Sequence, residues 1–139
     1  MQRKASAAWQ GGIKDGKGTV STESTVLSAT PYSFSTRFEG APGTNPEELI
    51  GAAHAGCFSM FLAALLTNAG STPTRIHTTA KVHLGEGPTI SLIELETEAE
   101  VPNLEEAAFL QHAETAKKNC PVSKALAGPE IKLKARLVK

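Results

Sequence analysis

One segment, residues 45–66, reads NPEELIGAAHAGCFSMFLAALL and carries the strongest helix signal of the chain. Asn45 suits the N-cap of a helix and Pro46 its first position. The following Glu47 and Glu48 favour the positive end of the helix dipole, and the Asn-x-x-Glu spacing resembles a capping box. Beyond these charges the helix is apolar on nearly every side. We therefore predict a central helix that other structure surrounds.

Segments with strand and turn signals flank this helix, which Gly70 is expected to end. Period-two alternation and turn residues predict a hairpin over residues 7–25, a strand over 31–39 that carries Arg37, a second hairpin from 74–84 and 89–101, and a closing strand over 130–139. Helical spacing returns over residues 104–118, and a short helical turn can begin at Pro121. This order of elements predicts an α+β fold with antiparallel sheets.

The bulk composition is that of one soluble globular domain covering residues 1–139. The 14 basic side chains balance 14 acidic ones, so neither nucleic acid nor an anionic membrane is an expected partner. The first ten residues lack the apolar core of a secretory signal, which makes the cytoplasm the default location.

Two explanations compete for the long apolar helix. A membrane span is one, but the helix contains His54 and Ser59 and lacks flanking basic and aromatic anchors. The other is a helix buried inside a soluble protein. Because so short a chain has little other structure to cover such a helix, we predict that a second subunit helps to bury it in a homodimer.

Cys57 lies inside this helix, and two interpretations of it stay open. Free cysteine often packs as a small buried hydrophobe, so an inert thiol is the simpler interpretation. A reactive Cys57 would need a cation, because burial raises the pKa of a thiol and the helix dipole acts only near the first turn. Arg37 is the candidate cation, since a guanidinium stays charged and donates several hydrogen bonds. Glu47 could hold Arg37 and fix its direction.

The second cysteine has a different setting. Cys120 follows two lysines and precedes Pro121, where free amide groups at the start of a helical turn favour a thiolate. In a reducing compartment, two cysteines are better candidates for inert core thiols or a redox couple than for a permanent disulfide. His54, one turn before Cys57, is more often a structural residue than a base. The other histidines lack ligand spacing and the glycines form no phosphate-binding fingerprint, so no metal and no cofactor is expected.

Two separated cysteine motifs in a fixed order carry a family resemblance. The chain resembles the osmotically inducible protein C (OsmC) family and, more loosely, the organic hydroperoxide resistance proteins of the same superfamily. The resemblance extends over essentially the whole chain. It lies in Gly16-Lys17-Gly18-Thr19-Val20-Ser21-Thr22, in Arg37-Phe38-Glu39-Gly40, in the run from Asn45 to Met60, and in Cys120-Pro121-Val122-Ser123.

This resemblance implies a cysteine peroxidase that forms an intertwined homodimer, with each active site at the subunit interface. By motif, it implies that Cys57 is the peroxidatic cysteine and Cys120 the resolving one. It also implies that Arg37 is the activating arginine and that Glu47 orients it, with the adjacent Glu48 as the alternative.

Chemistry and resemblance together predict the reduction of organic hydroperoxides to alcohols, in defence against oxidative or osmotic stress. Cys57 becomes a sulfenic acid, and Cys120 condenses with it to form a disulfide. An external dithiol, lipoyl-type or thioredoxin-like, must then reset the enzyme. An apolar vestibule could favour alkyl hydroperoxides, and its candidate residues are Phe38, Phe58, Met60 and Phe61. The alternative is a non-catalytic dimeric stress protein that binds an apolar ligand at the subunit interface.

Overall fold

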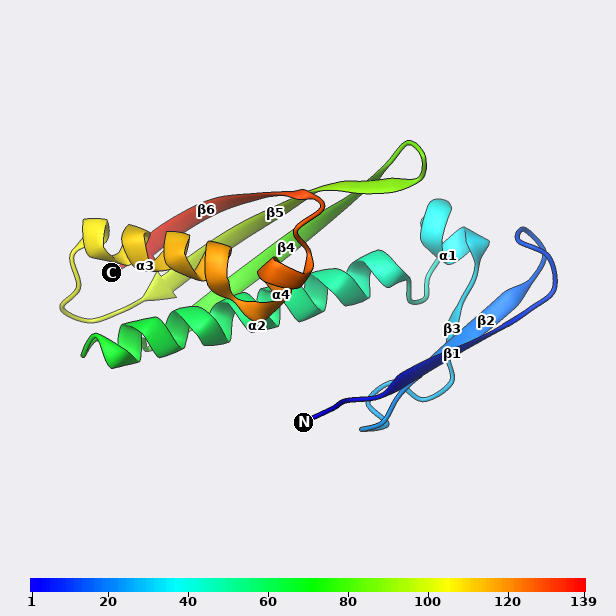
Figure 1. Cartoon of the computed structure of the whole chain (residues 1–139), viewed down its shortest axis with the longest axis horizontal. Coiled ribbons are helices and arrows are strands. Elements are labelled where there is room, and N and C mark those ends of the chain that lie inside the picture. Colours follow the sequence, from blue (N-terminus) through cyan, green and yellow to red (C-terminus); the bar gives the residue numbers. More distant parts are fainter. The chain divides into compact units, whose positions relative to one another are not determined.

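A computed structural model describes all 139 residues of the chain. The chain forms two compact units, residues Met1–Leu49 and residues Ile50–Lys139, called here the N-terminal and C-terminal units. They carry the blue-to-cyan and the green-to-red parts of Figure 1, in which their relative position is not determined. Each unit is therefore described by itself, and the expectation of a single domain stays a prediction.

The N-terminal unit is built on a small antiparallel sheet in the order β1-β2-β3. The strands are β1 (Ala5–Gln10), β2 (Lys17–Thr22) and β3 (Thr30–Tyr32). The first two form the predicted hairpin, with Trp9 opposite Gly18. Gly18 is needed there because a Cβ atom would lie 2.7 Å from the Trp9 ring and 2.6 Å from the Tyr32 ring. Glycine thus lets the two aromatic side chains meet across the sheet, with ring centroids 5.5 Å apart.

The predicted strand over residues 31–39 is wrong beyond Tyr32, because the helix α1 (Phe34–Phe38) follows. The hydroxyl of Ser33 accepts a hydrogen bond from the Thr36 backbone N–H at 3.3 Å, and the Thr36 hydroxyl accepts one from the Ser33 N–H at 2.9 Å. This reciprocal capping box starts a helix. The alternating aromatics then meet at helical spacing, since the Phe34 and Phe38 rings lie 4.8 Å apart. Arg37 therefore lies on a helix and not on a strand.

The C-terminal unit consists of a three-stranded sheet and helices. Strands β4 (Arg75–Gly85) and β5 (Thr89–Glu100) form the predicted second hairpin, and β6 (Glu130–Val138) is the closing strand. The helices are α2 (Pro46–Asn68), which belongs to this unit from Ile50 onward, α3 (Glu106–Asn119) and α4 (Pro121–Ala125). The α+β class is confirmed, and Figure 1 shows α2 and α3 running along the sheet.

The expectation of purely antiparallel sheets is wrong for this unit. Strand β6 pairs with β5 in parallel, from Leu92 opposite Glu130 to Glu100 opposite Val138. The reason is the connection, because α3 and α4 carry the chain back along the sheet before β6 begins. Parallel neighbours need such a helical crossover, whereas a tight turn gives an antiparallel pair.

The core of the C-terminal unit lies on one face of its sheet. Fully buried apolar side chains come from α2, β5, α3 and the α3–α4 junction: Phe58, Leu62, Leu66, Ile93, Ala99, Phe109, Ala113, Ala116 and Cys120. A polar ladder crosses the same region, since Ser59 donates to Thr78 at 2.7 Å and Thr78 lies 2.9 Å from Thr97. The opposite face of the sheet is charged and exposed, with cross-strand pairs such as Lys81 with Glu96. Apolar and charged side chains thus alternate along the strands. Because only one face of the sheet is apolar, helices pack against that face alone.

Helix α2 begins and ends as its sequence predicts. The Asn45 side chain accepts a hydrogen bond from the Glu48 backbone N–H at 2.8 Å, which makes Asn45 the N-cap. At the other end Gly70 has a φ of +86°, the left-handed conformation that lets the chain turn away from the helix. Ser71 then donates its N–H to the Leu66 carbonyl at 2.8 Å.

The sequence predicted that other structure surrounds α2. Within one chain, only one face of α2 is buried. Phe58 and Leu62 are 0% exposed against the sheet, whereas Met60 is 78% exposed. Gly56 has nothing within 4 Å of the place where its Cβ atom would be. By length and composition α2 could also cross a membrane. Its packed core face and its side-chain hydrogen bonds instead make it the core helix of the C-terminal unit.

Candidate active site

The fold brings the two cysteines together. Cys57 is half-buried on α2, Cys120 is buried at the junction of α3 and α4, and both are free thiols. The backbone N–H of Val122, on the first turn of α4, donates to Cys57 Sγ at 3.4 Å. The Cys120 thiol is close enough to Cys57 to influence its pKa. The junction that holds Cys120 therefore also contacts Cys57.

Cys120 occupies a defined position at the start of α4. It is the N-cap residue, and its Sγ accepts a hydrogen bond from the Ser123 backbone N–H at 3.4 Å. Pro121 follows in the first turn, where a missing N–H costs nothing. The predicted helical turn at Pro121 is thus present, and it aims free amide groups at both sulfur atoms.

Within the C-terminal unit, the surroundings of Cys57 raise the pKa of its thiol. Burial is the largest cause that raises the pKa of the Cys57 thiol, and the nearby Cys120 thiol raises it further. The Val122 N–H acts in the opposite direction, because it stabilises the thiolate. Since the net shift is upward, a reactive thiolate needs a cation from outside this unit. The role of Arg37 as that cation stays a prediction.

The candidate cation is held in the N-terminal unit by the predicted carboxylate. Arg37 donates from Nε at 3.0 Å and from Nη2 at 2.8 Å to the same oxygen, Glu47 Oε1. The Glu47 side chain is only 10% exposed. Glu48 is exposed, and the structure gives its side chain no contact with Arg37. Two hydrogen bonds to one buried carboxylate fix the direction of the guanidinium, and Glu47 is the residue that forms them.

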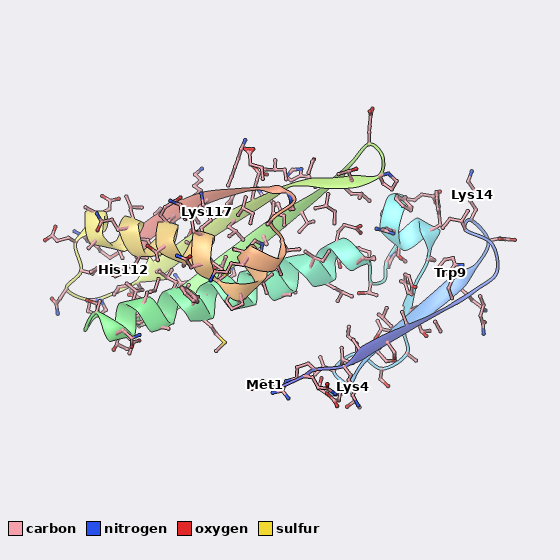
Figure 2. The ribbon with its side chains drawn as sticks, viewed as in Figure 1. Met1, Lys4, Trp9, Lys14, His112 and Lys117 are labelled. Atoms are coloured by element: carbon pink, nitrogen blue, oxygen red, sulfur yellow. The ribbon has the colours of Figure 1, made fainter.

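Arg37 also borders an aromatic pocket that the sequence reasoning missed. This pocket of about 250 Å³ is lined by Trp9, Ile13, Tyr32, Ser33, Phe34, Arg37 and Phe38. The guanidinium lies 5.4 Å from the centre of the Phe38 ring. Trp9, labelled in Figure 2, comes from β1, so strand pairing assembles the pocket from distant segments. Of the four expected vestibule residues, Phe38 lines this pocket, whereas Phe58 is core at 0% exposure.

The four predicted site residues thus form two pairs. Cys57 and Cys120 belong to the C-terminal unit, and Arg37 and Glu47 belong to the N-terminal unit. Because the structure does not fix the units relative to each other, an approach of Arg37 to Cys57 stays a prediction. The expectation that no metal takes part also stays a prediction.

A buried histidine completes the neighbourhood of Cys120. His54 on α2 is 0% exposed, and its Nε2 lies 2.7 Å from the hydroxyl of Ser123 on α4. Its Nδ1 is buried and has no hydrogen-bond partner. Burial lowers the pKa of His54, which keeps the ring neutral near pH 7. The sequence indicated a structural role for His54 but gave no role to Ser123, whose position three residues after an N-cap is the available signal.

The buried His54 predicts a destabilisation in mild acid. Below its ordinary pKa of 6.5, histidine binds a proton in the unfolded chain but not in the folded one. The unfolding free energy should therefore fall as pH drops from 6.5 toward the lowered pKa of the folded state, by at most about 1.4 kcal/mol per pH unit. Urea unfolding over this range checks the slope. His54→Gln should remove it, whereas His77→Gln, on the exposed face of β4, should leave it in place.

The chain is similar to known proteins over nearly its whole length. The sequence model of a family described as OsmC-like protein matches residues 38–135. Peroxiredoxin OsmC of Escherichia coli (strain K12) is 54% identical over 129 residues, which cover 91% of this chain and 90% of that protein. An OsmC-like protein from Mycoplasma pneumoniae has a TM-score of 0.77 at 17% identity, covering 100% of this chain and 99% of that one. An organic hydroperoxide resistance protein from Elizabethkingia anophelis has a TM-score of 0.67 at 25% identity, covering 100% and 98%.

Proposed function

Because the chain belongs to the OsmC-like protein family, we propose that it is a cysteine peroxidase that reduces organic hydroperoxides to alcohols. One structural observation carries the proposal. Residues 57 and 120, far apart in sequence, place their thiols beside the same short helix, where the Val122 N–H donates to one sulfur and the Ser123 N–H to the other. Backbone donors of this kind stabilise a thiolate, so the site suits two cysteines that act in turn.

The proposed first step is an attack of the Cys57 thiolate on a hydroperoxide. The sulfur bonds to the distal oxygen, the O–O bond breaks, and the alkoxide takes up a proton and leaves as an alcohol. Cys57 is then a sulfenic acid. In the second step Cys120 attacks this sulfur, water leaves, and a disulfide joins the two residues. A dithiol, lipoyl-type or thioredoxin-like, reduces the disulfide by thiol–disulfide exchange.

Arg37 is proposed to supply the positive charge that Cys57 lacks in its own unit. Its guanidinium would stabilise the thiolate and the peroxide oxygens, and the aromatic pocket beside it would hold the alkyl group of the substrate. The upward shift of the Cys57 pKa within the C-terminal unit supports this role, because no cation of that unit compensates the cost of burial.

The adjacent glutamates allow a matched test of this role. We expect Glu47→Gln to lower kcat/KM by about 100-fold, because a loosely held guanidinium no longer points at the reacting sulfur. The Cys57 pKa, measured by the pH dependence of alkylation, should rise in the same variant. Glu48→Gln, one residue away and exposed, should match the wild type in both measurements. Equal effects of the two substitutions would contradict the role of Glu47.

A homodimer is proposed because the N-terminal unit buries no large apolar side chain of its own. All residues of β1 are exposed, and a three-stranded sheet that buries so little apolar surface is only marginally stable. The exposed Met60 and Gly56 leave an uncovered apolar strip on α2 as well. We expect a solution mass of two 14.6 kDa chains, and Met60→Glu should shift the equilibrium toward the monomer in analytical ultracentrifugation.

Mass spectrometry tests the function directly. The reduced protein is mixed with one equivalent of cumene hydroperoxide, quenched in acid and weighed intact. We expect the loss of two hydrogens, which reports one disulfide per chain, and the release of one equivalent of cumyl alcohol. Sustained turnover should then require a dithiol such as dihydrolipoamide. An unchanged mass would instead favour a non-catalytic protein that binds an apolar ligand. Such chemistry suits the cytoplasm, where dithiol reductants are kept reduced.

A further inference from the structure

Three buried side chains form a continuous hydrogen-bonded chain behind the cysteine pair. The Cys120 thiol lies 3.1 Å from the Ser123 hydroxyl, which lies 2.7 Å from His54 Nε2. All three residues are buried, at 0%, 5% and 0% exposure. They come from α2 and from the start of α4, and so the tertiary fold alone brings them together.

The local structure of α4 places Ser123 between the two other groups. Ser123 donates its backbone N–H to the sulfur of the N-cap residue Cys120, which fixes the peptide around it. Its hydroxyl then points toward α2, where it meets the histidine ring. A serine hydroxyl can accept one hydrogen bond while it donates another, and it can therefore pass a proton between its neighbours.

Stability alone does not account for His54. A buried polar atom without a partner costs free energy, and Nδ1 of this ring has none. An apolar side chain of similar size would fill the same space without leaving a polar atom unpaired. One imidazole nitrogen is nevertheless directed at the hydroxyl that contacts Cys120.

We propose that Ser123 and His54 form a proton relay for the Cys120 thiol during disulfide formation, an inference that rests on the peroxidase function proposed above. As Cys120 Sγ forms a bond with Cys57 Sγ, its proton passes to the Ser123 oxygen, and the hydroxyl proton of Ser123 passes to His54 Nε2. The S–O bond of the sulfenic acid breaks, and the departing hydroxide takes up a proton from solvent and leaves as water. The proton held on His54 is afterwards released to solvent, so that one water forms per disulfide and the protons balance. The Cys57 sulfur is reduced, the Cys120 sulfur is oxidised, and no further reactant is needed.

The surroundings favour an uncharged base at this place. The ionisable groups next to the relay are the thiols of Cys57 on α2 and Cys120 at the α3–α4 junction. No Asp, Glu, Lys or Arg forms a hydrogen bond or ion pair with His54, and the charged residues of the sheet lie on its exposed face. The ring is consequently neutral at and above neutral pH, and because burial lowers its pKa it would hold the relayed proton only transiently. His54 acts through Ser123 and is a positioning residue in this scheme.

A single-turnover experiment separates the two oxidation steps. The reduced protein is mixed with one equivalent of cumene hydroperoxide, and hydroperoxide consumption reports the oxidation of Cys57. Intact mass after an acid quench at successive times reports disulfide formation. Both rates are measured from mildly acidic to alkaline pH in the wild type, His54→Gln, Ser123→Ala and the control His77→Gln. Glutamine keeps a carbonyl oxygen that can accept the hydrogen bond of the Ser123 hydroxyl but cannot take up its proton, so it preserves the structure of the site without its basicity.

The relay predicts a change in the shape of the pH profile. In the wild type and in His77→Gln, the rate of disulfide formation should be level across neutral and alkaline pH. In His54→Gln and Ser123→Ala it should fall about 100-fold at neutral pH and climb with pH, since the thiol must then ionise unaided. A profile of unchanged shape in both variants, even at a lower rate, would overturn the relay. A wild-type protein that fails to consume hydroperoxide would overturn the peroxidase function itself, which is a different result.

Discussion

The Cys57→Ser variant is expected to lose hydroperoxide turnover entirely, with kcat/KM reduced by at least about 1,000-fold. A serine hydroxyl does not ionise near neutral pH, and it is a far weaker nucleophile than a thiolate. The loss is measured as hydroperoxide consumption in the presence of excess dithiol. No intact-mass change should follow treatment with one equivalent of cumene hydroperoxide.

The Cys57→Ser variant tests the nucleophile specifically, because the substitution should leave the fold and the subunit contacts unchanged. Cys57 is half-buried on α2, and serine differs from it by one atom at the same position. The melting temperature and the solution mass should therefore stay close to those of the wild type. Full activity in a folded serine variant would show that the nucleophile has been assigned to the wrong residue.

The Cys120→Ser variant is expected to separate the two half-reactions. Cys57 should still consume one equivalent of hydroperoxide, because Cys120 does not take part in the first attack. The product should carry one added oxygen atom in place of the lost hydrogens. With excess hydroperoxide the Cys57 sulfenic acid should proceed to sulfinic and sulfonic acids, since no thiol of the chain captures it. Dithiol-dependent turnover should then decay as overoxidised protein accumulates.

The Cys120→Ser variant is expected to fold, because serine fits the place of Cys120. Cys120 is the N-cap of α4, and serine is among the residues that best fill an N-cap. The variant should thus keep the short helix, and with it the Val122 N–H that contacts Cys57. A Cys120→Ser protein that cycles at the wild-type rate without overoxidation would exclude Cys120 as the resolving residue.

Local signals predicted most of the secondary structure. The cap at Asn45 and the left-handed stop at Gly70 bound α2 as expected, because both act through neighbouring backbone groups. The two hairpins also follow from alternation and turns in the sequence. The alternation of apolar and polar residues wrongly predicted a strand at residues 34–38. The same aromatic spacing also fits a helix, and the capping box at Ser33 and Thr36 starts one.

Local sequence signals could not predict which strand β6 pairs with or in which direction. A closing strand can be recognised from its alternation, but its neighbour and direction depend on where α3 and α4 deliver the chain. Their path is set by the packing of Phe109 and Ala113 into the core. Long-range packing of this kind leaves no trace in the spacing of residues within β6.

The sequence alone predicted which residues carry chemistry, and these roles stay predictions. Cys57, Cys120, Arg37 and Glu47 became candidates because thiols, a guanidinium and a first-turn carboxylate have distinct chemical properties, and because their motifs resemble those of the OsmC family. Only the folded chain showed that Glu47 and not Glu48 holds Arg37, and that Ser123 joins His54 to Cys120. Residue identity is a local property, whereas a contact between groups 69 positions apart exists only after helices and strands have packed against one another.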